Sequence, residues 1–250
     1  MWTVAGKTIL VTGASRGTGF EASLELAHLG ASMILVGRDR TRTEAAVAAL
    51  RARTGATARS YLCDFSSQAS IRQLAAAVRR DHPRLDVLVN NAGGVQKRRT
   101  TTVDGLETTL ATNHLGYFLL TQLLRDLVVA SAPARIVSVA SIGHRHGTMD
   151  FDDLGFERGY SIMRAYSRSK LANVLFTREL ARQLAGAGVT VNCVHPGSVA
   201  TNIWSGTPLW AKPIVALFLR PSFILKRLWR LRNPTELASA VRGLRMVLKV

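Results

Sequence analysis

The sequence predicts an α/β fold, in which helices cover both faces of one doubly wound parallel sheet. Short apolar runs alternate with helical patterns along the chain, which is the order of elements in β–α–β units. The 250 residues suit a single domain, residues 1–250, and 47% of them are hydrophobic, enough for a large core. The runs expected to form buried strands are residues 7–11, 32–36, 58–63, 87–89, 135–139 and 189–194.

The first apolar run leads directly into a glycine-rich turn. Residues 12–19 contain Gly13, Gly17 and Gly19, and a helical pattern follows over residues 20–29. Glycines let a backbone approach a pyrophosphate, and the helix N-terminus supplies free amides and the positive end of the helix dipole. A flexible turn with incidental glycines is the alternative, but it does not explain both flanks. The sequence therefore predicts a Rossmann-type dinucleotide site.

Tyr166 and Lys170 form a second motif, within the sequence Tyr-Ser-Arg-Ser-Lys. A spacing of four residues puts a phenol and an ammonium on one face of a helix, one turn apart. A free phenol has a pKa of about 10, and a nearby cation lowers it. The pair can therefore move a proton to or from a carbonyl or alcohol oxygen. Taken alone, the spacing is more often a solvated surface pair; the dinucleotide turn gives it weight.

Over residues 5–204, these motifs and their order resemble the short-chain dehydrogenase/reductase family. Within that family, residues 113–121, 151–154 and 169–176 look like the retinol-dehydrogenase-like branch. The strand at 87–89 runs into a segment similar to the family's Asn-Asn-Ala-Gly. The positions that match the family's catalytic set are Asn113, Ser141, Tyr166 and Lys170.

The resemblance implies a role for each of these residues. Tyr166 would be the acid in reduction and the base in oxidation, and Lys170 would lower its pKa and hold the nicotinamide ribose. Ser141 would donate a hydrogen bond to the substrate oxygen, where charge develops. Asn113 would help to hold a water that relays the proton. Read without the other motifs, Ser141 is an ordinary serine at a strand end and Asn113 marks a helix kink.

The end of the second strand bears on the identity of the cofactor. An acidic residue there binds the ribose of NAD, whereas basic residues accommodate the phosphate of NADP. Gly37 stands where the family's NAD enzymes carry aspartate, and Arg38 and Arg16 could clamp a phosphate. This favours NADP(H) over NAD(H). Two alternatives stay open: a one-residue shift would let Asp39 reach a ribose, or the two arginines are surface charge.

The resemblance and the turn together define an expected cofactor-binding set. Asp64 is similar to the family residue that reads the adenine edge, and residues 196–197 resemble a Pro-Gly turn after the sixth strand. The full set is Gly13, Ser15, Arg16, Gly17, Thr18, Gly19, Arg38, Asp64, Asn91, Ala92, Gly93, Tyr166, Lys170, Pro196 and Gly197.

The C-terminal fifth of the chain is rich in both basic and apolar residues. Residues 201–250 hold nine Lys or Arg and one acid, which is +8 of the chain's net charge of +17. Residues 200–233 correspond to the family's substrate lid. Prolines and charges interrupt the apolar stretch 208–232. It therefore lacks the long continuous run of apolar residues that a membrane-spanning helix needs. It predicts a cover for a lipophilic alcohol or carbonyl substrate, or an interfacial segment in peripheral contact with a membrane.

The last residues leave the sheet edge open to two interpretations. Asn233 and Pro234 are typical of the start of a final helix. The serine-glycine pair that introduces the family's last strand is missing. Either residues 246–250 form a short strand, or the last edge strand is absent. A homodimer built on that edge is correspondingly uncertain.

Cysteine and histidine usage points to a reducing compartment and to no metal. Cys63 and Cys193 are expected to be buried small hydrophobes rather than a disulfide, which favours a cytoplasmic location. No basic stretch precedes an apolar one at the start, so we expect no signal peptide. His144 and His146 have no further ligands at metal spacing, so we expect no metal site.

We therefore predict an NADP(H)-dependent oxidoreductase that interconverts a lipophilic alcohol and its aldehyde or ketone. One alternative is a module that binds NADP with little or no turnover. The other is a nucleic-acid binder, suggested by the net charge of +17 and a pI near 11.3. No aromatic-basic stacking motif or recognition helix supports specific nucleic-acid binding, and we rank it last.

Overall fold

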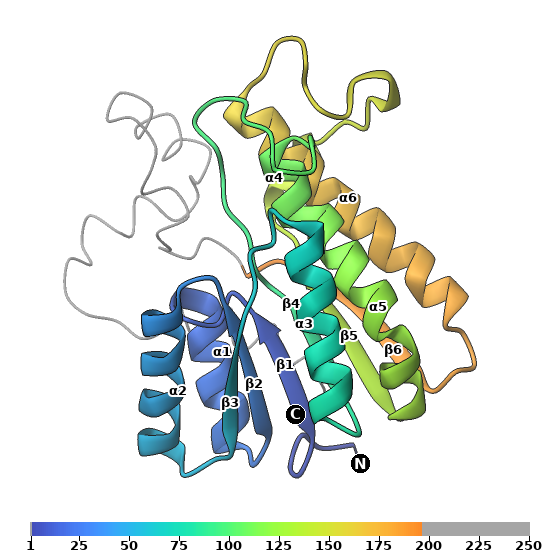
Figure 1. The fold of residues 1–250 in the computed structure, drawn as a ribbon. Coiled ribbons are helices and arrows are strands. Elements are labelled where there is room, and N and C mark those ends of the chain that lie inside the picture. Colours follow the sequence, from blue (N-terminus) through green and yellow to red (C-terminus); the bar gives the residue numbers. More distant parts are fainter. Residues whose placement is uncertain (1, 197–250) are drawn as a thin grey trace, which may run out of the picture.

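The computed structural model describes residues 2–196, and these form a six-stranded parallel sheet between two layers of helices (Figure 1). The strand order is β3-β2-β1-β4-β5-β6, with every neighbouring pair parallel. This confirms the predicted doubly wound sheet. The strands are β1 (Thr8–Thr12), β2 (Ser32–Gly37), β3 (Ala58–Leu62), β4 (Val87–Asn90), β5 (Ala134–Val139) and β6 (Val189–Val194).

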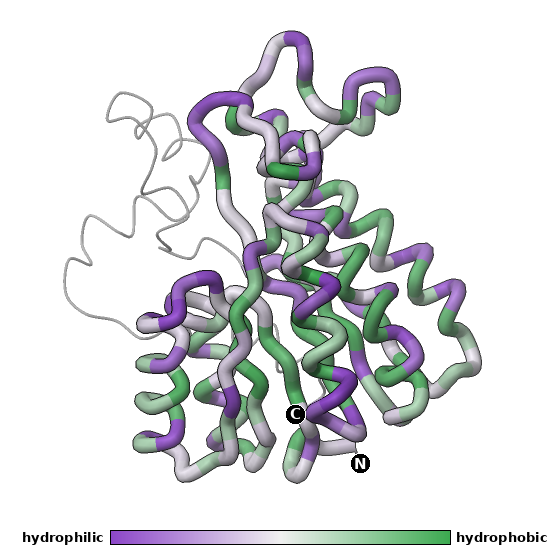
Figure 2. Tube along the Cα trace, in the orientation of Figure 1, coloured by the Kyte–Doolittle hydropathy of each residue, from purple (hydrophilic) through white to green (hydrophobic). Residues whose placement is uncertain are grey.

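Helices cover both faces of the sheet, so the central strands β1, β2 and β4 are apolar and buried on both sides. Ile9 and Val11 of β1 pack with α1 and α2, while Leu10 packs with α3, α5 and α6 on the opposite face. Figure 2 shows the hydrophobic strands at the centre and hydrophilic positions on the helix exteriors. The helices are α1 (Gly17–His28), α2 (Arg40–Thr54), α3 (Gln68–Asp81), α4 (Thr108–Leu110), α5 (Gly116–Ala130) and α6 (Ile162–Gln183).

Two boundaries differ from the sequence prediction in an informative way. Helix α1 begins at Gly17, three residues before the predicted start, because Gly17, Thr18 and Gly19 adopt helical hydrogen bonding without an apolar pattern. Between α4 and α5 the chain forms a π-helical turn, Ala111–Leu115, which the periodicity did not predict. Both differences lie beside the predicted site.

The chain reverses its direction of winding between β1 and β4, which are neighbours in the sheet although far apart in sequence. Ligands of open α/β sheets bind at such a switch point, beyond the carboxyl ends of the strands. The loops that follow β4 and β5 extend beyond this edge (Figure 1). The fold therefore brings the predicted motifs to one end of the sheet.

The structure bears on the predictions for the two cysteines and for a membrane-spanning helix, but not on those for the C-terminal region. Cys63 is buried and burial raises its pKa to about 12, as expected for a structural thiol, whereas Cys193 is only partly buried. Within residues 2–196, no helix is long and apolar enough to cross a membrane. Gly197, the lid 200–233 with its apolar stretch 208–232, and the candidate last strand 246–250 lie outside the described residues.

Candidate active site

The glycine-rich turn is built for close backbone packing. A Cβ on Gly13, whose φ is +65°, would lie 2.8 Å from the Cα of Ala92. A Cβ on Gly19 would lie 2.5 Å from both the carbonyl oxygen of Gly13 and Nδ2 of Asn91. Side chains at these two positions would push the turn away from the end of β4. The glycines therefore leave bare backbone at the start of α1, where a pyrophosphate would need it.

Thr12 joins the two loops that form this end of the site. Its Oγ1 accepts hydrogen bonds from the amides of Asn91 and Ala92 at 2.8 and 2.9 Å. The Asn91 side chain in turn donates to the Thr12 carbonyl at 2.7 Å. Thr12 was not among the predicted site residues, although its place at the end of β1 could have indicated it. It fixes the β4 loop against the glycine-rich turn.

These loops enclose one cleft of about 570 Å³ at the carboxyl edge of the sheet. It extends from the end of β2 past the glycine-rich turn to the loop after β4. Eleven of the fifteen predicted cofactor residues line it: Gly13, Ser15, Arg16, Gly17, Thr18, Gly19, Arg38, Asp64, Asn91, Ala92 and Gly93. Tyr166, Lys170 and Pro196 do not line it, and Gly197 lies outside the described residues.

At the β2 end of the cleft, Gly37 leaves no room for a side chain. A Cβ there would lie 2.2 Å from Oγ1 of Thr43, so a carboxylate side chain at this position would have to displace the Thr43 side chain of α2. Asp39 is the N-cap of α2: it accepts from the Arg42 amide at 2.8 Å and pairs with its guanidinium at 3.2 Å. The hydrogen bonds from Arg42 hold the pKa of Asp39 below its usual value. Asp39 thus serves the helix and is absent from the cleft lining.

The two arginines differ from Asp39 in lining the cleft, although Arg38 also interacts electrostatically with Asp39. Arg16 and Arg38 are exposed and line the cleft. Within the part of the chain that the structure describes, neither side chain donates a hydrogen bond to another protein group. Two guanidiniums whose donors make no hydrogen bond within residues 2–196 are suited to bind a phosphate.

Asp64 lies on the cleft wall beyond β3. Its Oδ1 accepts from the amide and the hydroxyl of Ser66, at 2.9 and 2.7 Å. The Ser70 hydroxyl accepts from the Asp64 amide at 3.0 Å. These contacts hold the carboxylate at the start of α3, where the second oxygen is not used by a protein hydrogen bond in residues 2–196.

Ser141, Tyr166 and Lys170 lie together at the end of β5. Ser141 donates a hydrogen bond to the Tyr166 hydroxyl. The Lys170 ammonium lies 5.8 Å from the centroid of the Tyr166 ring and donates to the Val139 carbonyl at 2.9 Å. Tyr166 is 8% and Lys170 3% exposed. The phenol and the ammonium are therefore held side by side and away from bulk water.

Burial governs the ionisation of both groups. It raises the pKa of Tyr166, and the hydrogen bond from Ser141 only partly opposes this. It lowers the pKa of Lys170 to about 8, because the charged ammonium loses hydration. The expectation that Lys170 lowers the pKa of the phenol stays a prediction, beside the opposite effect of burial. Tyr166 is consequently a protonated phenol at neutral pH, ready to act as an acid.

The low pKa of Lys170 has a consequence for stability. Its ordinary value is 10.5, so the unfolded chain holds this proton more tightly than the folded one. We expect Lys170→Met to raise the free energy of unfolding of the cofactor-free protein by about 1–3 kcal/mol at pH 7. The gain should shrink as pH rises from about 8 to 10.5, where the unfolded lysine also becomes neutral. Urea unfolding at pH 7 and pH 10 measures this, and a variant less stable at pH 7 contradicts it.

Asn113 lies in the π-helical turn and connects the β4 loop to α6. Its Oδ1 accepts from the Gly94 amide at 2.8 Å, and its Nδ2 donates to the Gly94 carbonyl and to Ser169 Oγ at 2.9 and 3.1 Å. Its own carbonyl accepts from Asn173 Nδ2 at 2.9 Å. Asn113 therefore marks an irregular helix, as one of the two sequence interpretations states, and its side chain positions the loop after β4. Its role in holding a water stays a prediction.

Gly93 and Asn173 complete this corner of the site. A Cβ on Gly93 would lie 2.9 Å from Oδ1 of Asn113 and 3.8 Å from Nζ of Lys170. Asn173 also bonds to Nδ1 of His114 at 2.9 Å. Asn173 was not predicted, although it lies one helical turn after Lys170. The loop after β4 thus reaches the Lys170 ammonium as bare backbone.

The switch-point cleft and the adjoining Ser141, Tyr166 and Lys170 define a dinucleotide-binding oxidoreductase of the α/β class. The family model described as short chain dehydrogenase matches residues 7–211. The chain belongs to the short-chain dehydrogenase family.

Known relatives agree with the predicted retinol-dehydrogenase-like branch. Retinol dehydrogenase 13 of Homo sapiens is 43% identical over 239 residues, covering 95% of this chain and 71% of the relative. Retinol dehydrogenase 14 of Homo sapiens is 45% identical over 228 residues, which cover 85% of this chain and 68% of the relative. The RhlG/NADP complex of Pseudomonas aeruginosa superposes with a TM-score of 0.73 at 28% identity, covering 97% and 90% of the two chains. The structure of an uncharacterized protein of Mycobacterium paratuberculosis superposes with a TM-score of 0.72 at 32% sequence identity. The match covers 98% of this chain and 76% of that protein.

Proposed function

We propose that this chain is an NADP(H)-dependent oxidoreductase that interconverts a lipophilic alcohol, of the retinol type, and its aldehyde or ketone. The observation that carries the proposal is the group of Ser141 with the buried Tyr166 and Lys170, which adjoins the dinucleotide cleft at Gly93. The retinoid class is supported by the relatives named retinol dehydrogenase. The basic, apolar stretch 208–232 favours an oily substrate on composition alone.

The residues present fit a nicotinamide dinucleotide. Gly13 and Gly19 leave bare backbone where any Cβ would collide, which is what close approach of a pyrophosphate requires. A bound nicotinamide would supply the hydride chemistry. At the β2 end, a carboxylate side chain in place of Gly37 would collide with Thr43, while Arg16 and Arg38 line the cleft. This arrangement supports a ribose that carries a 2′-phosphate.

The protein's own groups would then handle the proton. In reduction, Ser141 and the Tyr166 hydroxyl donate hydrogen bonds to the carbonyl oxygen, and Tyr166 transfers its proton as negative charge develops there. The neighbouring Lys170 ammonium stabilises the phenolate that remains. Asn113 keeps the β4 loop in place beside this ammonium through Gly94. In oxidation the same groups act in the opposite order.

The test is NADPH consumption with a panel of carbonyl compounds: retinals, long-chain and aromatic aldehydes, steroids and quinones. We expect turnover of retinal or another lipophilic carbonyl, faster with NADPH than with NADH. Tight NADPH binding without turnover of any compound would favour the alternative, an NADP-binding module with little or no activity.

We further propose a cytoplasmic protein in peripheral contact with a membrane through residues 208–232, which lie outside the described residues. This stretch holds six Lys or Arg and four Trp or Phe. Aromatic rings favour the lipid–water boundary, and each basic residue near an anionic surface contributes about 1 kcal/mol. We expect sedimentation with anionic vesicles at low salt and release at high salt. Equal binding to neutral vesicles, or none to anionic ones, contradicts this.

A further inference from the structure

Arg168 lies between Tyr166 and Lys170 on α6 but faces away from them. Residues two apart on a helix do not share a face. Arg168 is absent from the cleft lining, yet it is only 1% exposed and ranks among the largest fully buried side chains of the described residues. A fully buried arginine requires a structural explanation, because ionised side chains are almost never buried without compensation.

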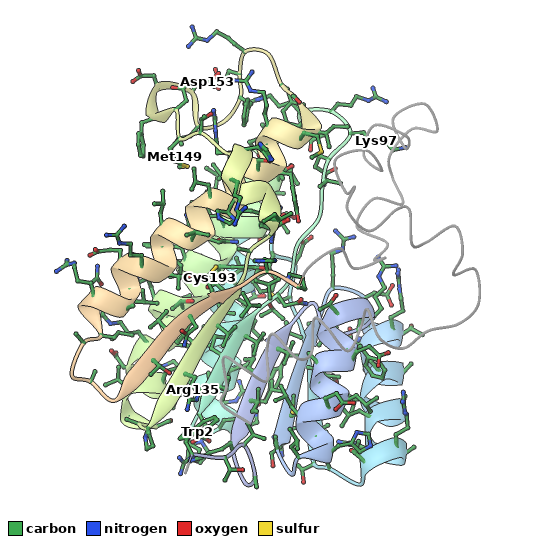
Figure 3. All side chains as sticks on the ribbon, turned by 180° about the vertical axis from the view of Figure 1, so that it is seen from behind. Trp2, Lys97, Arg135, Met149, Asp153 and Cys193 are labelled. Atoms are coloured by element: carbon green, nitrogen blue, oxygen red, sulfur yellow. The ribbon has the colours of Figure 1, made fainter. Side chains whose placement is uncertain are left out.

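The guanidinium holds the segment that precedes α6. Its Nε donates to the Thr148 carbonyl at 3.0 Å, and its Nη1 donates to the carbonyls of Asp153 and Leu154. Its Cζ lies 3.7 Å from the centroid of the Phe156 ring. Four groups of one irregular segment thus converge on one side chain. Figure 3 shows this segment, marked by Met149 and Asp153, beyond the carboxyl edge of the sheet.

The segment is strained and closely packed where Arg168 contacts it. Phe156 has φ +48°, in the left-handed region that a bulky side chain avoids. Such a conformation costs about 1–3 kcal/mol and persists only where the surroundings impose it. A Cβ on Gly147 would lie 2.6 Å from the Ser167 carbonyl, so the segment touches the backbone of α6. Its conformation therefore depends on these contacts with the catalytic helix.

The far end of the segment is attached to the cleft. The Tyr160 hydroxyl donates to the Gln96 carbonyl at 2.9 Å, and Gln96 lines the cofactor cleft. Arg99 donates to the Gly155 carbonyl at 2.8 Å. In the chain, the segment also joins Ser141 to Tyr166. Its conformation therefore sets where the serine lies relative to the phenol.

Charge alone does not account for Arg168. Burial lowers its pKa, and the carboxylates of Asp150 and Asp153 oppose this only through space. Within residues 2–196, its hydrogen bonds all go to main-chain carbonyls. An apolar side chain could fill the same volume without the cost of desolvation. What it could not do is donate to several carbonyls from one rigid plane.

We propose that Arg168 is a positioning residue, which holds residues 147–160 against α6 and so aligns Ser141 with Tyr166 for the substrate. It acts on the substrate side of the site, because Arg168 itself does not line the cofactor cleft. This inference rests on the proposed function for its kinetic part.

The test uses Arg168→Lys and Arg168→Met in the full chain. We expect kcat/KM for the carbonyl substrate to fall at least about ten-fold in both, because neither side chain offers a planar fork of donors. The Kd for NADPH should stay within about two-fold, since Arg168 is remote from the cleft lining. Amide hydrogen exchange in residues 148–160 should speed up at least about ten-fold, while residues 12–19 should not change.

Arg164→Met is the control. It removes an exposed cation from the same helix, whose guanidinium is 5.4 Å from the same Phe156 ring, and all three readouts should match the unmodified protein. Wild-type behaviour of Arg168→Lys would overturn the proposal, as would unchanged exchange in 148–160. If both variants lose NADPH binding, Arg168 is a general core residue and the proposal fails. If the unmodified protein reduces no carbonyl, the proposed function fails, and the exchange result alone decides the role of Arg168.

Discussion

Tyr166→Phe is expected to reduce kcat by about 10²–10⁴-fold, the contribution of a positioned general acid. The change removes the hydroxyl that is hydrogen-bonded to Ser141 and keeps the ring that lies 5.8 Å from the Lys170 ammonium. The ring remains, so the packing of α6 on β5 should persist and the Kd for NADPH should change by less than about two-fold. Stopped-flow reduction of the carbonyl substrate, with NADPH binding followed by fluorescence, measures both quantities.

Tyr117→Phe is a demanding control for this prediction. The Tyr117 hydroxyl is fully buried, and its ring centroid lies 5.7 Å from the same Lys170 ammonium. Within residues 2–196 this hydroxyl has no hydrogen-bond partner. Removing it takes the same atom from a similar place without touching the proposed proton path. Equal loss of activity in the two variants, or substantial activity in Tyr166→Phe, would remove Tyr166 from the role of proton donor.

The sheet and the cleft could be predicted because they depend on strong local patterns. Strands buried on both faces require continuous apolar runs, and these runs are visible in the sequence. Gly13 and Gly19 could be assigned because only glycine fits where the turn meets the end of β4. Parallel strands with alternating helices then bring Asn91, Ser141 and Tyr166 to one edge.

The misses share a physical cause, since each depends on contacts that leave no periodic trace. The π-helical turn at Asn113 inserts an extra residue without changing the apolar pattern. The carbonyls that bind Arg168 belong to a segment with little regular structure, so no sequence motif predicts these contacts. The pKa of Tyr166 depends on how deeply tertiary packing buries it, which a spacing of four residues cannot express.

The ambiguity at Asp39 was different, because the sequence did contain the answer. An aspartate directly before a helix is a favoured N-cap, and Asp39 precedes the helix that begins at Arg40. A side chain that caps the amide of Arg42 is already in use. Recognising the cap would have left Arg16 and Arg38 as the candidates for contact with the ribose end of the cofactor.

Arg38→Ala should therefore weaken NADPH binding by about ten- to a hundred-fold and leave NADH binding nearly unchanged. A charge-assisted hydrogen bond to a phosphate is worth about 1.5–3 kcal/mol, and NADH lacks the phosphate that would receive it. Arg16→Ala should act in the same direction, because both guanidiniums line the same end of the cleft. Titration with each cofactor at two salt concentrations measures the effect, and higher salt should narrow the preference for NADPH.

The variant Arg40→Ala distinguishes two explanations for a preference for NADPH: a specific phosphate clamp, and general electrostatic attraction by a basic protein. Arg40 is exposed, follows Arg38 by two residues, and pairs with Glu44 at 3.2 Å rather than lining the cleft. Its removal takes the same charge from almost the same place, so a clamp formed by Arg16 and Arg38 predicts little change in the NADPH to NADH ratio. A loss in Arg40→Ala equal to that in Arg38→Ala would assign the preference to long-range attraction. If Arg38→Ala weakens NADPH and NADH binding equally, Arg38 contacts a part of the cofactor that both share. The remaining argument for NADP would then be Gly37, where a carboxylate side chain would collide with Thr43.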